Sequence, residues 1–467
     1  MRISGGTAAG AALASAIVAS GPGAAANGRY PSSTQIVFSS AAPETGPIVV
    51  RTTYGLLVSR DGGSSWRWIC EAALGVPAVS IEDPSVALGA DDSLVVGLAE
   101  GLDESHDLGC NFACSPGALV GRAIVDLAGG PGPLVALSSA HVFDDAGNGA
   151  SLDTRVWRSD GDGDAWVQIG GALDPTVTAT TIDVARGDPR RLYVSGTRGY
   201  GSALTASLFV STDGGASWIE RPVPLDASSE FGIFIGAVDP DVPDRVYLRS
   251  TGASRLYVTD DAGQSFRVPI AFVGPMMGLA LSPDGALVYV GGPEDGLFVA
   301  STAGLADAGF TFRHVSSAPV QCLATRGVEL WACTDVASGF SVGVSIDGGT
   351  WVPKLVPGGL AGPVDCAPSP AGPFACQADA NVSQCAGEAF TAECTALGGC
   401  PPLLADAGAV EKTSPGFTGC GCDEAGRAGA GGIAAVVGLG ASWAMRRHRR
   451  LEMRRHRRVG EKRRRSD

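Results

Sequence analysis

The stretch Ser59-Arg60-Asp61-Gly62-Gly63-Ser64-Ser65-Trp66 returns with the same pattern, S-x-D-x-G-x-x-W, as Ser211-Thr212-Asp213-Gly214-Gly215-Ala216-Ser217-Trp218. Conservative or weaker forms end in an aromatic residue at five further places: residues 105–112, 159–166, 259–266, 307–312 and 345–351. The closing aromatic residues are 39 to 54 residues apart. Seven copies at such even spacing indicate an internal structural repeat.

The residue types of this motif are those of a tight hairpin turn. The Ser or Thr hydroxyl and the Asp carboxylate can accept backbone N–H groups inside the turn, and glycine allows a positive φ. We expect the closing aromatic side chain to fold back into the core. The residues to which this structural role is assigned are Asp61, Trp66, Asp107, Phe112, Trp166, Asp213, Trp218, Asp261, Phe266, Asp307, Phe312, Asp347 and Trp351.

Short alternating apolar segments flank each turn, for example residues 191–195 and 207–211 around the fourth copy. Four short strands in each repeat of about 46 residues, separated by Gly, Pro and Asp turns, are typical of a propeller blade. The sequence therefore predicts an all-β fold, a seven-bladed β-propeller of four-stranded blades over residues 34–357. An open stack of sheets is the alternative, but its terminal strand edges would stay unpaired.

The repeat resembles the Asp box of sialidase-like and sortilin-like β-propellers. This resemblance implies that the boxes lie at the blade periphery and are structural. A sialidase would also need an Arg cluster, a Tyr–Glu pair and an acidic Asp. Arg29-Tyr30-Pro31 partly matches the motif that carries the first of these arginines, but the other members cannot be identified. The catalytic residues of any such activity stay unassigned.

The two ends of the chain have the composition of targeting segments. Residues 1–26 combine an early Arg2, an uncharged Ala-rich stretch and Ala24-Ala25-Ala26, which predicts a secretory signal peptide. A plain Ala/Gly leader is the alternative. Residues 428–445 are free of charge and are followed by an Arg-rich tail, which predicts a short membrane span with a cytoplasmic C-terminus.

Cys420-Gly421-Cys422 stands just before this span, after a linker at residues 401–419. The order of Cys-Gly-Cys, apolar segment and Arg-rich end over residues 420–467 resembles the MYXO-CTERM sorting signal of myxobacterial exported proteins. The resemblance implies recognition at Cys420 and Cys422 by a sorting protease, removal of the span and display on the cell surface. An ordinary transmembrane anchor is the alternative.

The charge of the chain is divided unevenly. Of 467 residues, 34 are Lys or Arg and 48 are Asp or Glu, but residues 446–467 alone hold 12 basic and 3 acidic side chains. The body before this tail is therefore strongly acidic, and we expect it not to bind nucleic acid. With 45% apolar residues the chain can form a large core. We also expect the protein to be a monomer.

Twelve cysteines in an exported chain indicate disulfides. Cys322 and Cys333 lie on two adjoining strands of the last blade, and folding them about residues 327–328 places the two opposite each other. One pair is expected among Cys70, Cys110 and Cys114. The remaining cysteines, Cys366, Cys376, Cys385, Cys394 and Cys400, are expected to form a knot within a Cys-rich extension at residues 358–400, with pairing left open.

One acidic turn is a candidate metal site. Asp160, Asp162 and Asp164 alternate in the third repeat, where Gly161 replaces the usual Asp, and together they could chelate Ca²⁺. An EF-hand loop would also need a Glu at position 171, which is Gly. An ordinary surface turn is the alternative, and no other cofactor is expected.

These features favour a secreted, surface-displayed propeller that binds or adheres to a glycan or protein ligand. A glycoside hydrolase of the sialidase-like superfamily is the second interpretation, and an inert envelope component is the third. A propeller fold alone does not distinguish them, because function depends on the loops at one face.

Overall fold

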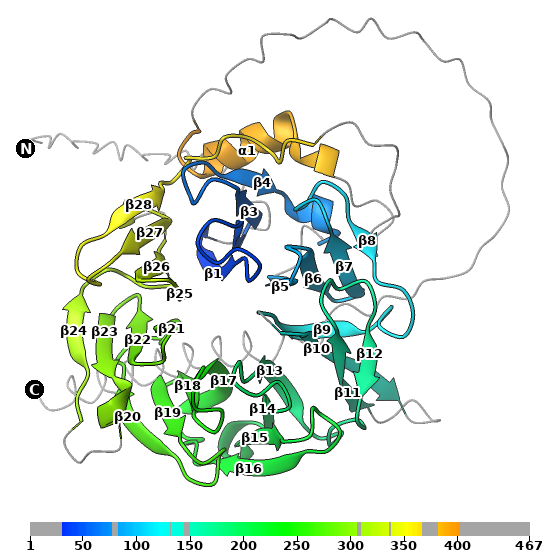
Figure 1. Cartoon of the computed structure of the whole chain (residues 1–467), viewed down its shortest axis with the longest axis vertical. Coiled ribbons are helices and arrows are strands. Elements are labelled where there is room, and N and C mark those ends of the chain that lie inside the picture. Colours follow the sequence, from blue (N-terminus) through cyan, green and yellow to red (C-terminus); the bar gives the residue numbers. More distant parts are fainter. Residues whose placement is uncertain are drawn as a thin grey trace, which may run out of the picture.

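The computed structural model describes residues 30–76, 83–130, 132–143, 150–305, 310–335, 338–366 and 382–400. The expected signal peptide, linker and sorting segment, with Arg29, Cys420 and Cys422, lie outside the described residues, as do Asp307 and Cys376. The described part is an all-β propeller of seven four-stranded antiparallel sheets arranged as a ring (Figure 1).

Each blade is a meander in which the strands pair in chain order. Blades one to three contain β1 (Ser33–Phe38), β2 (Ile48–Thr52), β3 (Gly55–Ser59), β4 (Arg67–Ile69); β5 (Ser85–Leu88), β6 (Leu94–Leu98), β7 (Gly101–Ser105), β8 (Ala113–Cys114); and β9 (Ala123–Ala128), β10 (Leu134–Phe143), β11 (Ala150–Ser159), β12 (Val167–Ile169). Blades four and five contain β13 (Thr178–Val184), β14 (Leu192–Arg198), β15 (Thr205–Ser211), β16 (Ile219–Val223); and β17 (Glu230–Val238), β18 (Val246–Gly252), β19 (Arg255–Thr259), β20 (Arg267–Ala271). Blades six and seven contain β21 (Gly278–Leu281), β22 (Leu287–Gly292), β23 (Gly296–Ser301), β24 (Arg313–Ser316); and β25 (Cys322–Arg326), β26 (Glu329–Cys333), β27 (Val342–Ser345), β28 (Val352–Leu355).

The burial of each strand follows its place in the blade. Middle strands such as β3 and β6 are buried along their whole length, because neighbouring blades cover both of their faces. The outermost strands, such as β16 and β20, are largely exposed. The first strand of each blade contacts the first strands of its neighbours, so these strands line the centre of the ring (Figure 1). The core is accordingly a series of apolar layers between blades.

The repeated turns connect the third and fourth strands. In the first, the Ser59 hydroxyl donates to Asp61 Oδ1 at 2.8 Å and accepts the N–H of Gly63 at 2.8 Å. Asp61 Oδ1 also accepts the N–H groups of Ser64 and Ser65. Gly63 has a φ of +85°, which glycine adopts without strain. Equivalent bonds to the carboxylate recur in the turns that contain Asp107, Asp213, Asp261 and Asp347.

The closing aromatic side chains pack between blades but are buried to different degrees. Trp66 and Phe112 are buried, whereas the others are half-buried: Trp166, Trp218, Phe266, Phe312 and Trp351. Trp66 Nε1 donates to the carbonyl of Lys354 in β28 at 2.9 Å, so the first blade's turn contacts the seventh blade. These contacts make each turn part of a blade junction.

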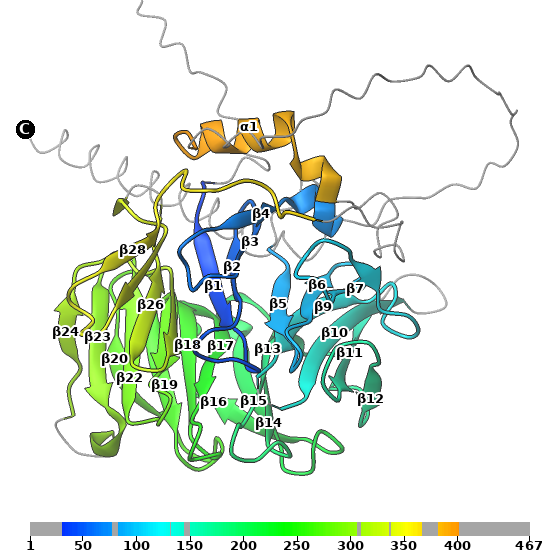
Figure 2. The same cartoon turned by 45° about the horizontal axis from the view of Figure 1, so that its top comes forward.

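The ring closes between blades seven and one without exchanging a strand. β1 lies against β25 and β26, and the segment after β28 continues as a parallel strip along β4. In this strip, Trp68 donates its N–H to the carbonyl of Gly362 at 2.9 Å and accepts the N–H of Val364 at 3.0 Å. The following short helices η5 (Val382–Cys385) and α1 (Glu388–Ala396) lie beside the first blade (Figure 2).

Disulfides fasten this closing segment to the ring, which corrects two of the expected pairings. Cys70 bonds to Cys385 and Cys110 bonds to Cys366, with Cα–Cα distances of 5.3 and 5.4 Å. The expectation of a pair within Cys70, Cys110 and Cys114 was therefore wrong for Cys70 and Cys110. The physical reason is that the extension turns back along β4 towards blade two, which brings its cysteines to the outer strands.

The remaining described disulfides are local. Cys322 and Cys333 are joined across β25 and β26, where they are direct register partners. Cys394 bonds to Cys400 just after α1. The extension is thus no self-contained knot: Phe390 of α1 is buried against Trp68, with ring centroids 6.1 Å apart, and belongs to the core layer of blades seven, one and two.

Candidate functional site

The partial sialidase motif at residues 29–31 does not form a site in the part of the chain that the structure describes. Arg29 lies outside the described residues, and Tyr30 is 59% exposed just before β1. The carbonyl of Tyr30 accepts a hydrogen bond from the Thr53 hydroxyl at 3.0 Å. The described part of this motif therefore ties the chain to the β2–β3 turn.

Polar side chains on the first strands bond to neighbouring blades around the centre. Thr180 donates its hydroxyl to the carbonyl of Ile233 at 2.6 Å, and Thr181 accepts the N–H of Ile235 at 2.8 Å. Thr325 donates to the carbonyl of Leu281 at 2.6 Å. Each bond joins backbone of one blade to a side chain of the next, and we call them the inter-blade bonds.

Two carboxyl groups also lie on first strands, and one of them makes an inter-blade bond. Asp126 of β9 accepts the N–H of Ile182 in β13 at 2.9 Å, and Asp183 of β13 accepts the N–H of Val184. Burial raises the pKa of Asp126 to about 7 and that of Asp183 to about 6. A raised pKa is a property that a general acid needs, so Asp126 and Asp183 are candidates for acid chemistry.

Arg51 of β2 lies close enough to Asp126 for its positive charge to oppose the rise in the Asp126 pKa. Burial, together with the positive charge of Arg51, lowers the pKa of Arg249 to about 10. Arg249 stacks over the ring of Phe234, with its guanidinium carbon 5.0 Å from the ring centroid, and donates to the carbonyl of Met276. Side chains from blades one, three and five, Arg51, Asp126 and Arg249, thus bring charge of both signs together.

The two faces of the ring differ in what they expose. Because the strands alternate in direction, the repeated turns lie at one face, which we call the turn face. The loops between second and third strands and the links between blades lie at the other, the loop face. Three aromatic side chains are exposed on the loop face of consecutive blades: Phe143 (53% exposed), Tyr200 (89%) and Phe231 (62%). Exposed aromatic groups of this kind are enriched at binding surfaces.

The candidate calcium turn directs its three carboxylates to different partners. Asp160 accepts from Arg158 Nε at 2.7 Å, and Asp162 Oδ1 accepts the N–H of Asp164 at 3.2 Å. Asp164 itself faces blade two, where its Oδ1 lies 2.8 Å from His106 Nε2. Among the described residues, the close acidic group at this turn includes Asp164 but not the other two.

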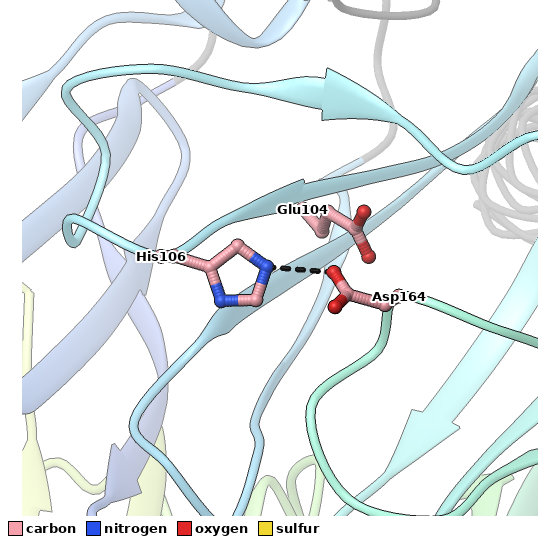
Figure 3. A group of neighbouring side chains, drawn as sticks. All are labelled: Glu104, His106 and Asp164. Carbon is pink, nitrogen blue, oxygen red and sulfur yellow. Dashed lines mark hydrogen bonds and ion pairs between the residues drawn. The ribbon is translucent and has the colours of Figure 1, made fainter.

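That group consists of Glu104, His106 and Asp164, whose ligand atoms lie within 4.8 Å of one another (Figure 3). Glu104 is near the end of β7, and His106 is the second residue of the turn that follows it. Asp164 comes from the turn between β11 and β12 of the next blade (Figure 3). On the other side of the imidazole, His106 Nδ1 lies 3.4 Å from Asp91 Oδ2.

The sequence reasoning missed Glu104, His106, Asp126 and Asp183. A signal existed for the two aspartates, because each is a charged residue between apolar neighbours in a strand: Val125-Asp126-Leu127 and Ile182-Asp183-Val184. Glu104 and His106 flank the first residue of a repeated turn, and their partner Asp164 is 58 residues away from His106. Their proximity depends on how two blades pack.

No helix of the described residues is long and apolar enough to cross a membrane. The expected span at residues 428–445 lies outside those residues.

Comparison with known proteins shows likeness of fold only. No protein family and no curated protein matches the sequence. Among solved structures, a GH74 xyloglucanase from Xanthomonas campestris matches 74% of this chain and 66% of its own, with 17% identity and a TM-score of 0.32. The extracellular domain of a one-component system protein from B. thetaiotaomicron matches 68% of this chain and 38% of its own, with 13% identity and a TM-score of 0.44.

A third similar structure is the Cps50 (Swd1) β-propeller domain from Myceliophthora thermophila. It matches 66% of this chain and 95% of its own, with 10% identity and a TM-score of 0.40. The chain thus spans slightly under two thirds of the xyloglucanase and about two fifths of the one-component system domain. The chain is a seven-bladed, disulfide-bonded β-propeller with distant structural neighbours of several kinds.

Proposed function

We propose that this protein is an exported β-propeller that binds a glycan or protein ligand through its loop face. The observation that carries the proposal is the exposure of Phe143, Tyr200 and Phe231 on that face in three consecutive blades. Large aromatic groups supply much of the free energy of binding at interfaces and cost little conformational entropy.

Export is supported by the disulfides. Four bridges are present in the described residues, and two of them join segments more than 250 residues apart. Bonds of this kind persist in oxidising compartments outside the cytoplasm. We therefore keep the signal peptide at residues 1–26 as part of the proposal.

The assignment of the repeated turns and of the C-terminal sorting signal is also part of the proposal. We infer that the seven turns are Asp boxes, and the hydrogen bonds of Asp61 and its equivalents support this.

We further propose that residues 420–467 are a MYXO-CTERM-type sorting signal that is recognised at Cys420 and Cys422. Changing both cysteines to serine should leave uncleaved chain in the inner membrane, and mass spectrometry of surface-released protein would find a C-terminal peptide ending at Asp467 if no processing occurs.

Loop-face variants test the binding proposal. Purified full-length secreted protein is screened on a glycan array and against cell-surface extracts, and the best ligand is then titrated with Phe143→Ala, Tyr200→Ala and Phe231→Ala. Loss of one anchoring aromatic should weaken binding roughly tenfold or more. The matched controls are Val328→Ala and Ile346→Ala, which are 86% and 82% exposed on the turn face. Equal losses on the two faces would contradict the proposal.

A glycoside hydrolase is the second candidate, and it is favoured by the raised pKa values of Asp126 and Asp183. Both carboxyl groups already accept backbone N–H groups, which gives them a structural role as well. The purified protein is incubated with chromogenic glycosides beside an Asp126→Asn variant. Hydrolysis by the wild type that the variant abolishes would establish the enzyme and displace the binding proposal.

A further inference from the structure

The group formed by Glu104, His106 and Asp164 combines one imidazole with two carboxylates at the junction of blades two and three (Figure 3). Acidic groups on protein surfaces are common, so proximity alone says little. The informative member is Glu104. Its side chain is only 7% exposed, yet its Oε2 is buried and has no hydrogen-bond partner. A buried carboxylate oxygen without a donor is costly, because the lost hydration is not replaced.

The surroundings of Glu104 increase that cost. The carboxylates of Asp164 and Asp162 lie near it, and burial together with their negative charge raises the pKa of Glu104 to about 7. Gly163 provides the space on this side, because a Cβ there would lie 2.8 Å from a methyl carbon of Val95 and 3.4 Å from Glu104 Oε2. Several negative groups thus converge on one point, which a cation would stabilise.

The chemistry of the donors restricts the kind of cation. Calcium takes six to eight oxygen ligands and magnesium demands an octahedral oxygen shell, so neither matches a site with an imidazole at its centre. One nitrogen and two carboxylate oxygens are suited to Zn²⁺ and related divalent ions. In tetrahedral coordination two such ligand atoms are roughly 3.3 Å apart. His106 Nε2 and Asp164 Oδ1 are now 2.8 Å apart, on side chains that are 47% and 59% exposed and free to adjust.

The outer contacts of the histidine have the arrangement that metal sites use. Asp91 Oδ2 lies 3.4 Å from His106 Nδ1, on the opposite side of the ring from Asp164. A carboxylate at this nitrogen holds the proton on Nδ1 and directs the lone pair of Nε2 towards the metal. Asp91 is itself positioned by the N–H of Ser93, which donates to its Oδ1 at 3.0 Å.

The sequence of the third turn explains why the group occurs at this junction. In the described turns that carry an Asp at the third position, its carboxylate binds N–H groups of the same turn, as that of Asp61 does. The third turn has Gly161 there, and its acids stand at Asp162 and Asp164 instead. Asp164 is therefore directed to blade two and not to its own backbone.

We propose that Glu104, His106 and Asp164 form a binding site for a divalent transition-metal ion of the Zn²⁺ class. Three protein ligands leave a position for water or for a ligand group on the exposed side. The bound ion would also cross-link the turn of blade two to the turn of blade three. This site is independent of the loop-face proposal, because both of its turns lie on the turn face.

The test uses full-length secreted protein without a polyhistidine tag, stripped with EDTA and titrated calorimetrically with Zn²⁺. We expect one site, a rise in melting temperature with Zn²⁺, and a visible d–d absorption band with Co²⁺. Glu104→Gln should weaken Zn²⁺ at least tenfold and abolish the Co²⁺ band. The matched control is Asp160→Asn, which alters an 82% exposed acid of the same turn that pairs with Arg158.

A second variant keeps the test valid if Glu104→Gln changes folding. Asp164→Asn alters an exposed ligand and should lose Zn²⁺ while its metal-free melting temperature stays close to that of the wild type. The proposal is overturned if stripped wild-type protein takes up no Zn²⁺, if the ligand variants and Asp160→Asn bind equally, or if Ca²⁺ binds and Zn²⁺ does not.

Discussion

The junction that closes the ring and the junction between blades four and five solve the same packing problem in different ways. Between blades four and five, an apolar layer with buried Tyr193, Leu208 and Tyr257 is joined by the inter-blade bonds of Thr180 and Thr181. At the closure, the layer extends over blades seven, one and two and into the extension, and two long-range disulfides cross it. The first and last blades of this ring exchange no strand. Their junction alone joins the two ends of the propeller chain, so the ring depends on the apolar layer and the disulfides there to stay closed.

The largest expected effect comes from removing that fastening. Changing Cys70 and Cys110 together to serine should destabilise the protein by roughly 4 kcal/mol or more, because each bridge restricts a long loop of the unfolded chain. Denaturant unfolding followed by tryptophan fluorescence measures the change. The matched control is the double change of Cys394 and Cys400, whose bridge spans six residues and should matter less. If the two double variants lose equal stability, the covalent bonds at the closure contribute no more than a local bridge does.

The second prediction compares two equivalent tryptophans. Trp66 is 1% exposed at the closure and donates to Lys354, whereas Trp218 is half-buried between blades three and four and its Nε1 has no partner. Trp66→Ala should cost about 3–5 kcal/mol, and Trp218→Ala should cost less. Denaturant unfolding of the two variants measures the loss in the free energy of unfolding. A larger loss for Trp218→Ala would show that the position of the tryptophan in the ring does not govern its contribution to stability.

The third prediction concerns the inter-blade bonds. Thr181→Val keeps the shape of the side chain but removes the acceptor of the Ile235 N–H. The unpaired backbone group should cost about 1–3 kcal/mol. Thr395→Val is the control and should change stability little, because the exposed Thr395 hydroxyl donates to the Thr391 carbonyl one turn away in α1. Hydrogen exchange of the Ile235 amide would locate the effect, and unchanged protection would contradict it.

The last prediction is a pH dependence at the centre of the ring. The pKa of Asp126 is raised to about 7 in the folded protein, so the folded state holds a proton that the unfolded state has released. The stability that Asp126 contributes is present below pH 4 and is lost as the pH rises through 7. Asp126→Asn should therefore flatten the fall in melting temperature between pH 4 and pH 7. A slope equal to that of the wild type would contradict the assignment.

The comparison of junctions also shows how far the sequence could predict this molecule. The seven turns are encoded locally, because Ser59, Asp61 and Gly63 bond to one another within five residues. The bridge between Cys322 and Cys333 is predictable in the same way, since both lie on one hairpin. The pairing of Cys70 with Cys385 could not be predicted, because it depends on where the extension returns, 315 residues later.

The candidate metal site likewise depends partly on local sequence and partly on tertiary packing. The sequence alone determined that the chain forms seven four-stranded blades, that their turns need Ser, Asp and Gly, and that the third turn departs from the pattern at Gly161, because hairpin chemistry acts over a few residues. Only the tertiary structure decided that the extension fastens the ring and that Asp164 meets Glu104 and His106. The physical reason is that packing between blades sets which distant side chains share a space, and no local pattern encodes that geometry.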